Sequence, residues 1–279
     1  MNKKIKIADI PFDPVTYGQA IERVSDLIKK DKKVYITTPN PEMVLEADRN
    51  KEFEDILKNS SLSIPDGIGI LWASYYLSLP LPKNKLIQYL QFIKSLFAIL
   101  FTPKKIRKVL PARVTGTDLF ERMIDESQKH KWRVFLLGAK PGVAHKAINS
   151  LLKKYPKAIF AGSHSGSPSL NEENEICEII NISKPDILFV AYGSPAQELW
   201  IKRNLSGLHT VKVAVGIGGA FDFAAGEVKR APVILQKIGL EWLWRLIQEP
   251  KRKTRIKNAT LIFIKYIYNL KNVKKIEKM

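Results

Sequence analysis

The sequence predicts an α/β protein: a Rossmann-like parallel sheet with flanking helices, followed by a basic helical C-terminal appendage. Short β-branched runs alternate with longer helix-like stretches over the first 230 residues, as expected where helices join parallel strands. Beyond Pro232 the pattern is helical and basic to the end. We therefore expect an α/β core at residues 1–230, with an apolar and basic insertion at 83–110, and a helical membrane-associating appendage at 231–279.

Each expected element is bounded by a turn signal or by a change of hydrophobic period. The strand at 33–38 is a β-branched run that ends at Pro39-Asn40-Pro41, because proline cannot continue a strand ladder. The strand at 133–137 opens onto the glycine turn at 138–142, which is typical of a strand-to-helix connection. The same reasoning predicts further strands at 158–163, 186–191 and 211–215, and helices at 42–57, 68–79, 118–129, 143–154, 172–182 and 195–203.

The net charge of +19 lies in two segments of the chain. Residues 83–113 carry eight Lys/Arg and no acidic residue, and residues 229–279 carry fourteen Lys/Arg against three acidic residues. Such segments fit a polyanionic partner, either nucleic acid or an anionic membrane. The single cysteine, Cys177, cannot form an internal disulfide, and the first residues lack the apolar core of a signal peptide. We therefore expect a cytoplasmic protein.

The apolar content of both basic segments favours a membrane as the partner. Residues 86–101 form a helix-like pattern too short to span a bilayer comfortably, so a helix lying in the interface with basic flanks fits better. A buried core helix is the alternative. Residues 259–270 repeat the theme, and we expect peripheral attachment to the inner face of the plasma membrane. The polar residues of the first segment gather on one narrow strip, formed by Gln88, Gln91, Lys94 and Ser95.

A glycine-rich turn follows the last expected strand. Gly216-Ile-Gly-Gly219 comes directly after residues 211–215, and glycines let backbone N–H groups approach an anion without interference from a Cβ atom. Three arginines then follow in quick succession, at Arg245, Arg252 and Arg255. This arrangement is suited to a polyanionic ligand, and the alternative is a tight turn followed by a solvated basic face.

Further polar blocks follow other strands, at the edge where open α/β sheets collect ligands. Neither glycine turn has the Gly-x-Gly-x-x-Gly spacing of a dinucleotide site, and the sequence contains no Asp-x-Asp and no histidines at metal-ligand spacing. The four blocks are Thr38-Pro-Asn40-Pro-Glu42, Pro65-Asp-Gly-Ile-Gly69, Arg113-Val-Thr-Gly-Thr-Asp118 and Gly193-Ser-Pro-Ala-Gln-Glu-Leu-Trp200.

Together with the run from Gly216 to Arg255, these blocks resemble, in order, the motifs of the WecG/TagA/CpsF glycosyltransferase family. The insertion at 83–110 departs from the usual family pattern. The resemblance implies an inverting, metal-independent glycosyltransferase that needs no cofactor. It also implies transfer of N-acetylmannosamine, or a related sugar, from UDP to an undecaprenyl-diphosphate-linked N-acetylglucosamine in teichoic acid or other surface polysaccharide synthesis.

Asp66 is the candidate catalytic base. Partial burial in a turn can give a carboxylate the raised pKa that base catalysis near neutral pH needs. On residue type alone an Asx turn is the stronger interpretation, and the match to the family's catalytic Asp reverses this. The candidate substrate-binding residues supply hydroxyl, amide, guanidinium and backbone N–H groups: Thr38, Asn40, Arg113, Gln197, Gly216, Gly218, Gly219, Arg245, Arg252 and Arg255.

The expected partners are a UDP-sugar donor, a polyprenyl-diphosphate-linked sugar acceptor and an anionic membrane surface, with no nucleic acid. Whether the chain forms a homo-oligomer stays open. The competing hypothesis is a non-catalytic basic protein that binds membrane or nucleic acid through its two charged segments. That hypothesis predicts no nucleotide binding and indifference to the loss of Asp66.

Overall fold

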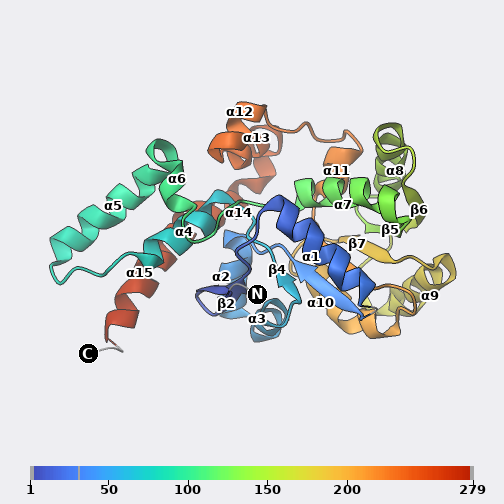
Figure 1. The fold of residues 1–279 in the computed structure, drawn as a ribbon, viewed down its shortest axis with the longest axis horizontal. Helices are drawn as coiled ribbons and strands as arrows, with labels where there is room; N and C mark the ends of the chain where they lie inside the picture. The colour runs from blue at the N-terminus through green and yellow to red at the C-terminus, as the bar shows by residue number, and fades with distance from the viewer. Residues whose placement is uncertain (1–2, 31, 277–279) are drawn as a thin grey trace.

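A six-stranded parallel sheet forms the centre of the structure (Figure 1). This computed structural model describes residues 3–30 and 32–276, apart from the side chains of residues 237, 238, 252 and 274–276. The strand order is β4-β3-β8-β7-β5-β6, and each neighbouring pair is parallel, which confirms the expected Rossmann-like class. The strands are β3 (Val34–Thr37), β4 (Leu62–Ser63), β5 (Arg133–Gly138), β6 (Ile159–His164), β7 (Ile187–Ala191) and β8 (Val213–Gly216).

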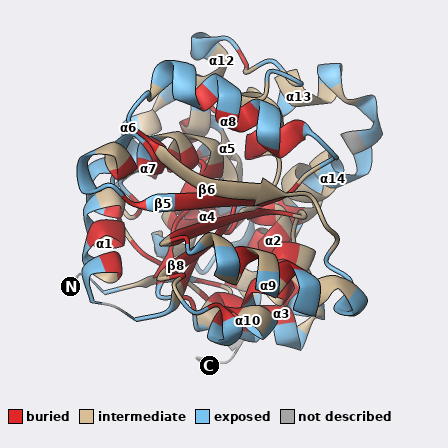
Figure 2. Ribbon diagram, turned by 90° about the vertical axis from the view of Figure 1, so that its right-hand side faces the viewer, coloured by how far each residue is buried: buried red, intermediate tan, exposed pale blue. Residues whose placement is uncertain are grey.

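Helices cover both faces of this sheet, as Figure 2 shows by the buried strands between two helical layers. Successive side chains of a strand point to opposite faces. In β5, Val134 and Leu136 pack in the apolar cluster under α1, α7, α8 and α11, whereas Phe135 and Leu137 pack in the cluster under α3, α9 and α10. The helices are α1 (Tyr17–Lys29), α3 (Lys51–Lys58), α7 (Gly116–His130), α8 (Val143–Lys154), α9 (Glu173–Ser183), α10 (Ala196–Asn204) and α11 (Ala220–Ala224).

The stretch at 42–57, expected as one helix, forms two: α2 (Pro41–Arg49) and α3. Asn50 separates them with φ −121° and ψ 102°, and its side chain accepts a hydrogen bond from the N–H of Phe53 at 3.1 Å. Asparagine is favoured at such a helix start because its side-chain oxygen satisfies a free backbone N–H. The hydrophobic period continues across the single non-helical residue, so the sequence pattern concealed the break.

A third apolar cluster lies beyond the β4 edge of the sheet. It contains the antiparallel pair β1 (Ile5–Ile7) and β2 (Ile10–Phe12), with α2 and α4 (Ile68–Ser78). The last helix, α15 (Phe263–Ile276), also belongs to this cluster, because Phe263 and Ile267 are fully buried there. The remaining C-terminal elements are α12 (Val233–Ile238), α13 (Glu241–Gln248), a 3₁₀ turn (Pro250–Arg252), α14 (Lys253–Lys257) and a π-helical turn (Asn258–Ile262).

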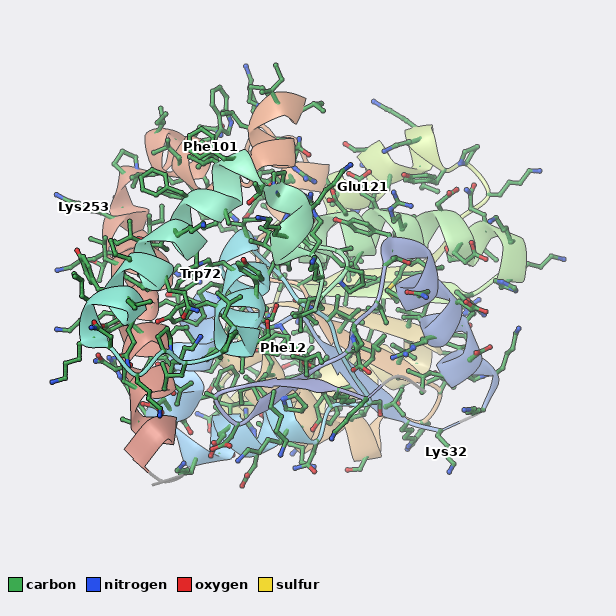
Figure 3. The ribbon with its side chains drawn as sticks, turned by 60° about the vertical axis from the view of Figure 1, so that its left-hand side comes forward. Phe12, Lys32, Trp72, Phe101, Glu121 and Lys253 are labelled. Carbon is green, nitrogen blue, oxygen red and sulfur yellow. The ribbon has the colours of Figure 1, made fainter. Side chains whose placement is uncertain are left out.

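The insertion forms α5 (Lys85–Phe101) and the short α6 (Pro103–Ile106), and both helices pack against α4. The indole N–H of Trp72 donates to Ser95 Oγ at 3.0 Å, and the ring of Phe92 lies 4.7 Å from that of Tyr268. In Figure 3, Trp72 lies beside α5, and Phe101 lies at the end of α5 that leads into α6. Because most of α5 is exposed, it is not a buried core helix. Among the residues that the structure describes, no helix combines the length and apolarity needed to cross a membrane.

Candidate active site

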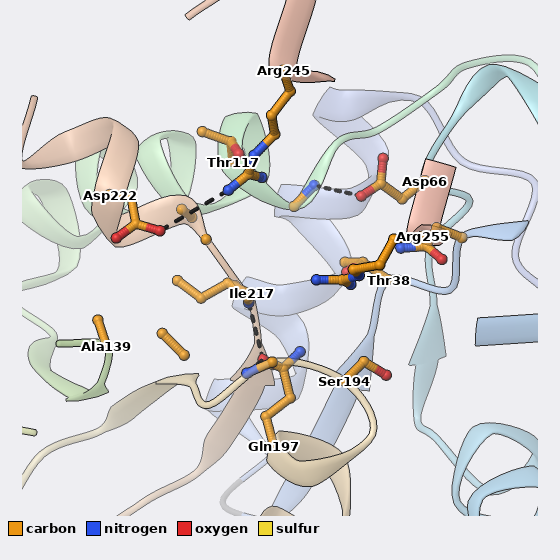
Figure 4. A pocket seen from close by; sticks show the side chains of 18 of the residues that line it. Thr38, Asp66, Thr117, Ala139, Ser194, Gln197, Ile217, Asp222, Arg245 and Arg255 are labelled. Atoms are coloured by element: carbon orange, nitrogen blue, oxygen red, sulfur yellow. Dashed lines mark hydrogen bonds and ion pairs between the residues drawn. The ribbon is translucent and has the colours of Figure 1, made fainter. Parts of the chain in front are cut away.

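A pocket of about 750 Å³ opens at the carboxyl ends of the strands (Figure 4). Its walls come from the loops after β3, β4, β5, β7 and β8, from the first turn of α7, and from α13 and α14. The strands of a parallel sheet end at one edge, so motifs far apart in the sequence meet there. The sequence-predicted residues that line it are Thr38, Asn40, Asp66, Gln197, Gly216, Gly218, Gly219, Arg245 and Arg255.

Asp66 lies in the turn between β4 and α4. Its N–H donates to the carbonyl of Pro39 at 3.1 Å, and Gly67, with φ of +97°, reverses the chain immediately afterwards. The left-handed region that Gly67 occupies is readily available to glycine. The carboxylate Oδ2 accepts a long hydrogen bond, 3.4 Å, from the N–H of Gly116 at the start of α7. The turn therefore aims the carboxylate into the pocket and against a helix N-terminus.

Burial raises the pKa of Asp66 to about 6, although the charge of Arg113 and the N–H of Gly116 act in the opposite direction. A buried carboxylate is harder to ionise because the apolar surroundings solvate its charge poorly. With this pKa, Asp66 is ionised at neutral pH and is still basic enough to accept a proton. These are the properties that a general base requires.

Thr38 and Asn40 lie beside Asp66. A Cβ atom on Gly116 would be 3.4 Å from Thr38 Oγ1 and 3.9 Å from Asp66 Oδ2. The Thr38 hydroxyl and the Asp66 carboxylate therefore both lie next to Gly116, at the start of α7. Asn40 is the N-cap of α2, because its Oδ1 accepts from the N–H of Met43 at 3.0 Å. The Thr38 hydroxyl and the Asn40 amide NH₂ are thus the groups here that can meet a sugar.

Gln197 joins the loops after β7 and β8. Its Oε1 accepts from the N–H groups of Gly193 and Gly218, at 3.1 and 3.0 Å. Its Nε2 donates to Glu198 Oε1 at 2.7 Å, and burial raises the pKa of Glu198 to about 7. Because the Gly218 N–H is already donated to Gln197, this part of the glycine turn is held from within the protein.

Because Gly216 has no side chain, the buried side chains of Gln197 and Glu198 can pack directly against it beneath the pocket. A Cβ atom there would lie 2.6 Å from Gln197 Nε2 and 2.8 Å from Glu198 Oε1, closer than packed atoms tolerate. The N–H of Ile217 donates to the carbonyl of Val190 at 3.0 Å. The glycines therefore provide close packing beneath the pocket, in addition to any backbone contact with a ligand.

Arg245 enters the pocket from α13. Its Nε donates to Glu249 Oε2 at 2.7 Å, its Nη2 lies 4.0 Å from Asp222 Oδ2, and the guanidinium stands 4.9 Å from the centre of the Phe223 ring. Nη2 is buried and makes no hydrogen bond to any residue in the described part of the chain. A buried guanidinium N–H without a partner is costly, so this nitrogen points to an anionic ligand.

The other predicted arginines differ in their surroundings. Arg255, in α14, lines the pocket and is paired with Glu42 at 2.8 Å. Arg113 donates from Nη2 to the backbone carbonyl of Gln236 in α12 at 2.8 Å, and it acts on Asp66 through its charge. The side chain of Arg252 lies outside the described residues.

A second ion-pair network fastens the C-terminal segment beside the pocket. Arg230 pairs with Asp118 of α7 at 3.0 Å and with Glu241 of α13 at 2.9 Å, and Asp118 also accepts from the hydroxyl of Tyr17 at 2.8 Å. Sequence reasoning placed both Asp118 and Arg230 in motif blocks but did not predict that they pair. The two residues of this pair are 112 positions apart, and a local sequence pattern carries no information about contacts at that separation. Within residues 3–30 and 32–276, no group of three His, Cys, Asp or Glu side chains could hold a metal ion.

The fold and the pocket define a Rossmann-like α/β protein with a carboxylate and arginines at the strand ends, a site suited to an anionic substrate. Comparison with known proteins agrees: the family model described as the glycosyl transferase WecG/TagA/CpsF family matches residues 5–107 and 97–275. The chain belongs to this family and is thus a hexosyltransferase-type enzyme, which decides against the non-catalytic alternative.

Two relatives illustrate the similarity. The chain is 33% identical over 229 residues to the N-acetylglucosaminyldiphosphoundecaprenol N-acetyl-β-D-mannosaminyltransferase of Bacillus spizizenii W23, covering 82% of this chain and 77% of the relative. It is 28% identical over 274 residues to the protein of the same name from Staphylococcus aureus MRSA252, covering 98% and 95% of the two chains. The second alignment extends across nearly the whole chain, including the C-terminal segment.

Proposed function

We propose that the protein transfers N-acetylmannosamine from UDP to N-acetylglucosamine linked to undecaprenyl diphosphate, with inversion and without a metal ion. The relatives' names support the sugar and the acceptor. The observation that carries the proposal is that one pocket holds a carboxylate, Asp66, and a guanidinium, Arg245, whose buried Nη2 has no hydrogen-bond partner among the described residues. The first can take a proton from the acceptor, and the second can meet the charge of the leaving group.

The reaction is a single displacement. The acceptor hydroxyl oxygen attacks the anomeric carbon as its proton passes to the Asp66 carboxylate, and the bond between that carbon and the UDP oxygen breaks. UDP leaves with the bonding electron pair, and Arg245 and Arg255 stabilise its added negative charge. Thr38 and Asn40 orient the sugar. Attack from the side opposite to UDP inverts the anomeric configuration.

A lipid-linked acceptor places this reaction at a membrane. We propose that the enzyme binds peripherally to the inner face of the plasma membrane, at an anionic surface, because all its excess positive charge lies in two segments that are also rich in apolar residues. Binding as a monomer and binding as a homo-oligomer are both compatible with this proposal.

Asp66→Asn tests the proposed base. The amide replaces the carboxylate with little change of shape, so transfer should fall by about a hundred- to ten-thousandfold, while UDP binding measured by calorimetry changes little. Thr38→Val, which also removes a polar group from the pocket, is the comparison: it should weaken sugar binding without removing proton acceptance. If Asp66→Asn kept more than half the activity, Asp66 would not be the base.

The donor and the metal requirement need a separate assay. The enzyme is incubated with a panel of UDP-sugars and a prenyl-diphosphate-linked N-acetylglucosamine, and the products are identified by mass spectrometry. We expect the N-acetylmannosamine product, formed equally well with EDTA. Activity that disappears with EDTA and returns with magnesium or manganese would contradict the role given to the arginines.

A further inference from the structure

Helix α5 presents an apolar face to solvent. Scattered single apolar side chains are normal on a protein surface, whereas a contiguous group marks an interaction site. Leu90 and Phe97 are 56% and 57% exposed, and Phe101 is 73% exposed. Figure 1 shows α5 beside α15, at the end of the molecule away from β6. The exposed face of α5 consists of Leu86, Ile87, Tyr89, Leu90, Phe97, Leu100 and Phe101.

The opposite face of α5, which combines Gln88 and Ser95 with the apolar Phe92, Ala98 and Ile99, is turned toward the protein. Gln88 donates from Nε2 to the carbonyl of Pro82 at 2.6 Å, and Gln91 donates to the carbonyl of Pro80 at 3.0 Å. Ser95 accepts from the indole of Trp72. A surface helix normally buries its apolar stripe and exposes its polar one. Helix α5 departs from this pattern because it is apolar on both sides. Phe92, Ala98 and Ile99 pack inward, and these contacts hold the second apolar face outward.

The charge around this face identifies its partner. Residues 83–113 contain eight Lys/Arg and no acidic residue, and Lys83, Lys85 and Lys94 are exposed. A second copy of the chain would bring like charges together, which is unfavourable. A bilayer with anionic headgroups complements both the lysines and the apolar side chains between them.

We propose that the exposed face of α5 is the surface that docks the enzyme on an anionic bilayer, with the helix lying in the interface. At 17 residues α5 suits this position. The C-terminal stretch at 259–270 offers less apolar surface, because Phe263 and Ile267 are buried against the core. The docking proposal rests on the proposed function only in that a lipid-linked acceptor requires the enzyme to reach a membrane.

The test is co-sedimentation of the full chain with vesicles of phosphatidylcholine, alone or mixed with phosphatidylglycerol, without sugar substrates. Binding should require the anionic lipid and weaken with salt. The double variant Leu90→Gln/Phe97→Gln leaves the charge unchanged. It should bind about a hundredfold more weakly, because withdrawing each apolar side chain from lipid costs about tenfold. Circular dichroism melting checks that the variant remains folded.

The double variant Leu170→Gln/Ile182→Gln is the matched control, because it removes two exposed apolar side chains outside α5 and should bind like the wild type. Undiminished binding of the α5 variant would overturn the proposal, as would equal binding of the wild type to neutral and anionic vesicles. A wild-type dimer that the α5 variant converts to a monomer, with vesicle binding unchanged, would instead assign the face to a second copy. Since no substrate is present, failure of the transferase proposal would leave these results intact.

Discussion

Arg255 and Glu42 form a two-pronged ion pair across 213 positions of sequence, with nitrogen–oxygen distances of 2.8 and 3.0 Å. The pair fastens α14 to the start of α2 at the wall of the pocket. It therefore joins the C-terminal segment to the loop that carries Thr38 and Asn40. Paired guanidinium groups of this kind keep a defined orientation and can still share their charge with an incoming phosphate.

Arg255→Ala should lower kcat/KM for transfer by about a hundredfold, because it removes a charge that stabilises the departing diphosphate. Glu42→Ala should cost about tenfold or less, since it removes only the group that orients the arginine. Steady-state kinetics of both variants and of the double variant measure the difference. If the three variants lost the same activity, the pair would act as an anchor for α14 and Arg255 would not reach the substrate.

The pH dependence of transfer should show the titration of Asp66. The carboxylate must be ionised to accept a proton, and its pKa is raised to about 6. kcat/KM should therefore be level above that pH and fall about tenfold per pH unit below it. The measurement is a pH–rate profile between about pH 5 and about pH 8.

Arg113 provides the matched variants for this profile. Its positive charge lowers the pKa of Asp66, so Arg113→Gln should move the acid limb of the profile to higher pH, whereas Arg113→Lys keeps the charge and should move it less. Both variants alter the bond to the Gln236 carbonyl. If the acid limb shifted equally in the two variants, the shift would result from the altered bond to Gln236. If the limb did not move in either variant, Asp66 would not be the titrating group.

The edge of the sheet where the site lies was predictable from the sequence. Thr38 and Asp66 follow apolar strands and Gly216 ends one, and the carboxyl ends of parallel strands meet at one edge. Most strands and helices were predictable for the same reason, because their hydrophobic periods are local. The one-residue break at Asn50 was not, since it leaves the helical period undisturbed.

The partners of the arginines could not be predicted from the sequence. Arg255 with Glu42, and Arg230 with Asp118, are pairs of residues far apart in the chain, and a pair of this kind has no periodic signature. The orientation of α5 is a related case. Its polar strip was visible, but only the structure shows that Gln88 and Ser95 face inward while Lys94 is exposed.

Glu198 should make the protein less stable as the pH rises. Its carboxyl is buried, which raises its pKa from 4.5 to about 7. The folded state thus favours the neutral form: the stability due to this group is full below about pH 4.5 and is lost as the pH rises through about 7. Glu198→Gln should match the wild type near pH 5 and exceed its free energy of unfolding by about 2–3 kcal/mol near pH 8.

Denaturant unfolding at the two pH values measures this difference. The exposed Glu178 is the control position, where the same substitution should change stability little at either pH. A Glu198→Gln variant that is equally destabilised at both pH values would show that the carboxylate is needed for packing or hydrogen bonding, and that its ionisation is not costly.

Gly219→Ala should impair transfer without unfolding the protein. A Cβ atom at this position would clash with the guanidinium of Arg245 and lie 3.2 Å from Asp222 Oδ2. The guanidinium is the end of a long side chain and can swing away, so the fold should tolerate the methyl group while Arg245 leaves its place in the pocket. Losing one charge that stabilises the leaving group should lower kcat by about a hundredfold. Thermal unfolding and steady-state kinetics measure the two effects separately.

Two other glycines calibrate this result. Gly216→Ala places the methyl group against the buried Gln197 and Glu198, which cannot move, so it should cost about 1–3 kcal/mol of stability. Gly207→Ala meets no atom within 4 Å and should change neither stability nor transfer. We therefore expect Gly207→Ala to have nearly wild-type transfer activity. Gly219→Ala should have low transfer activity although it remains fully folded. A Gly219→Ala enzyme with normal turnover would mean that Arg245 does not act on the leaving group from the position seen here.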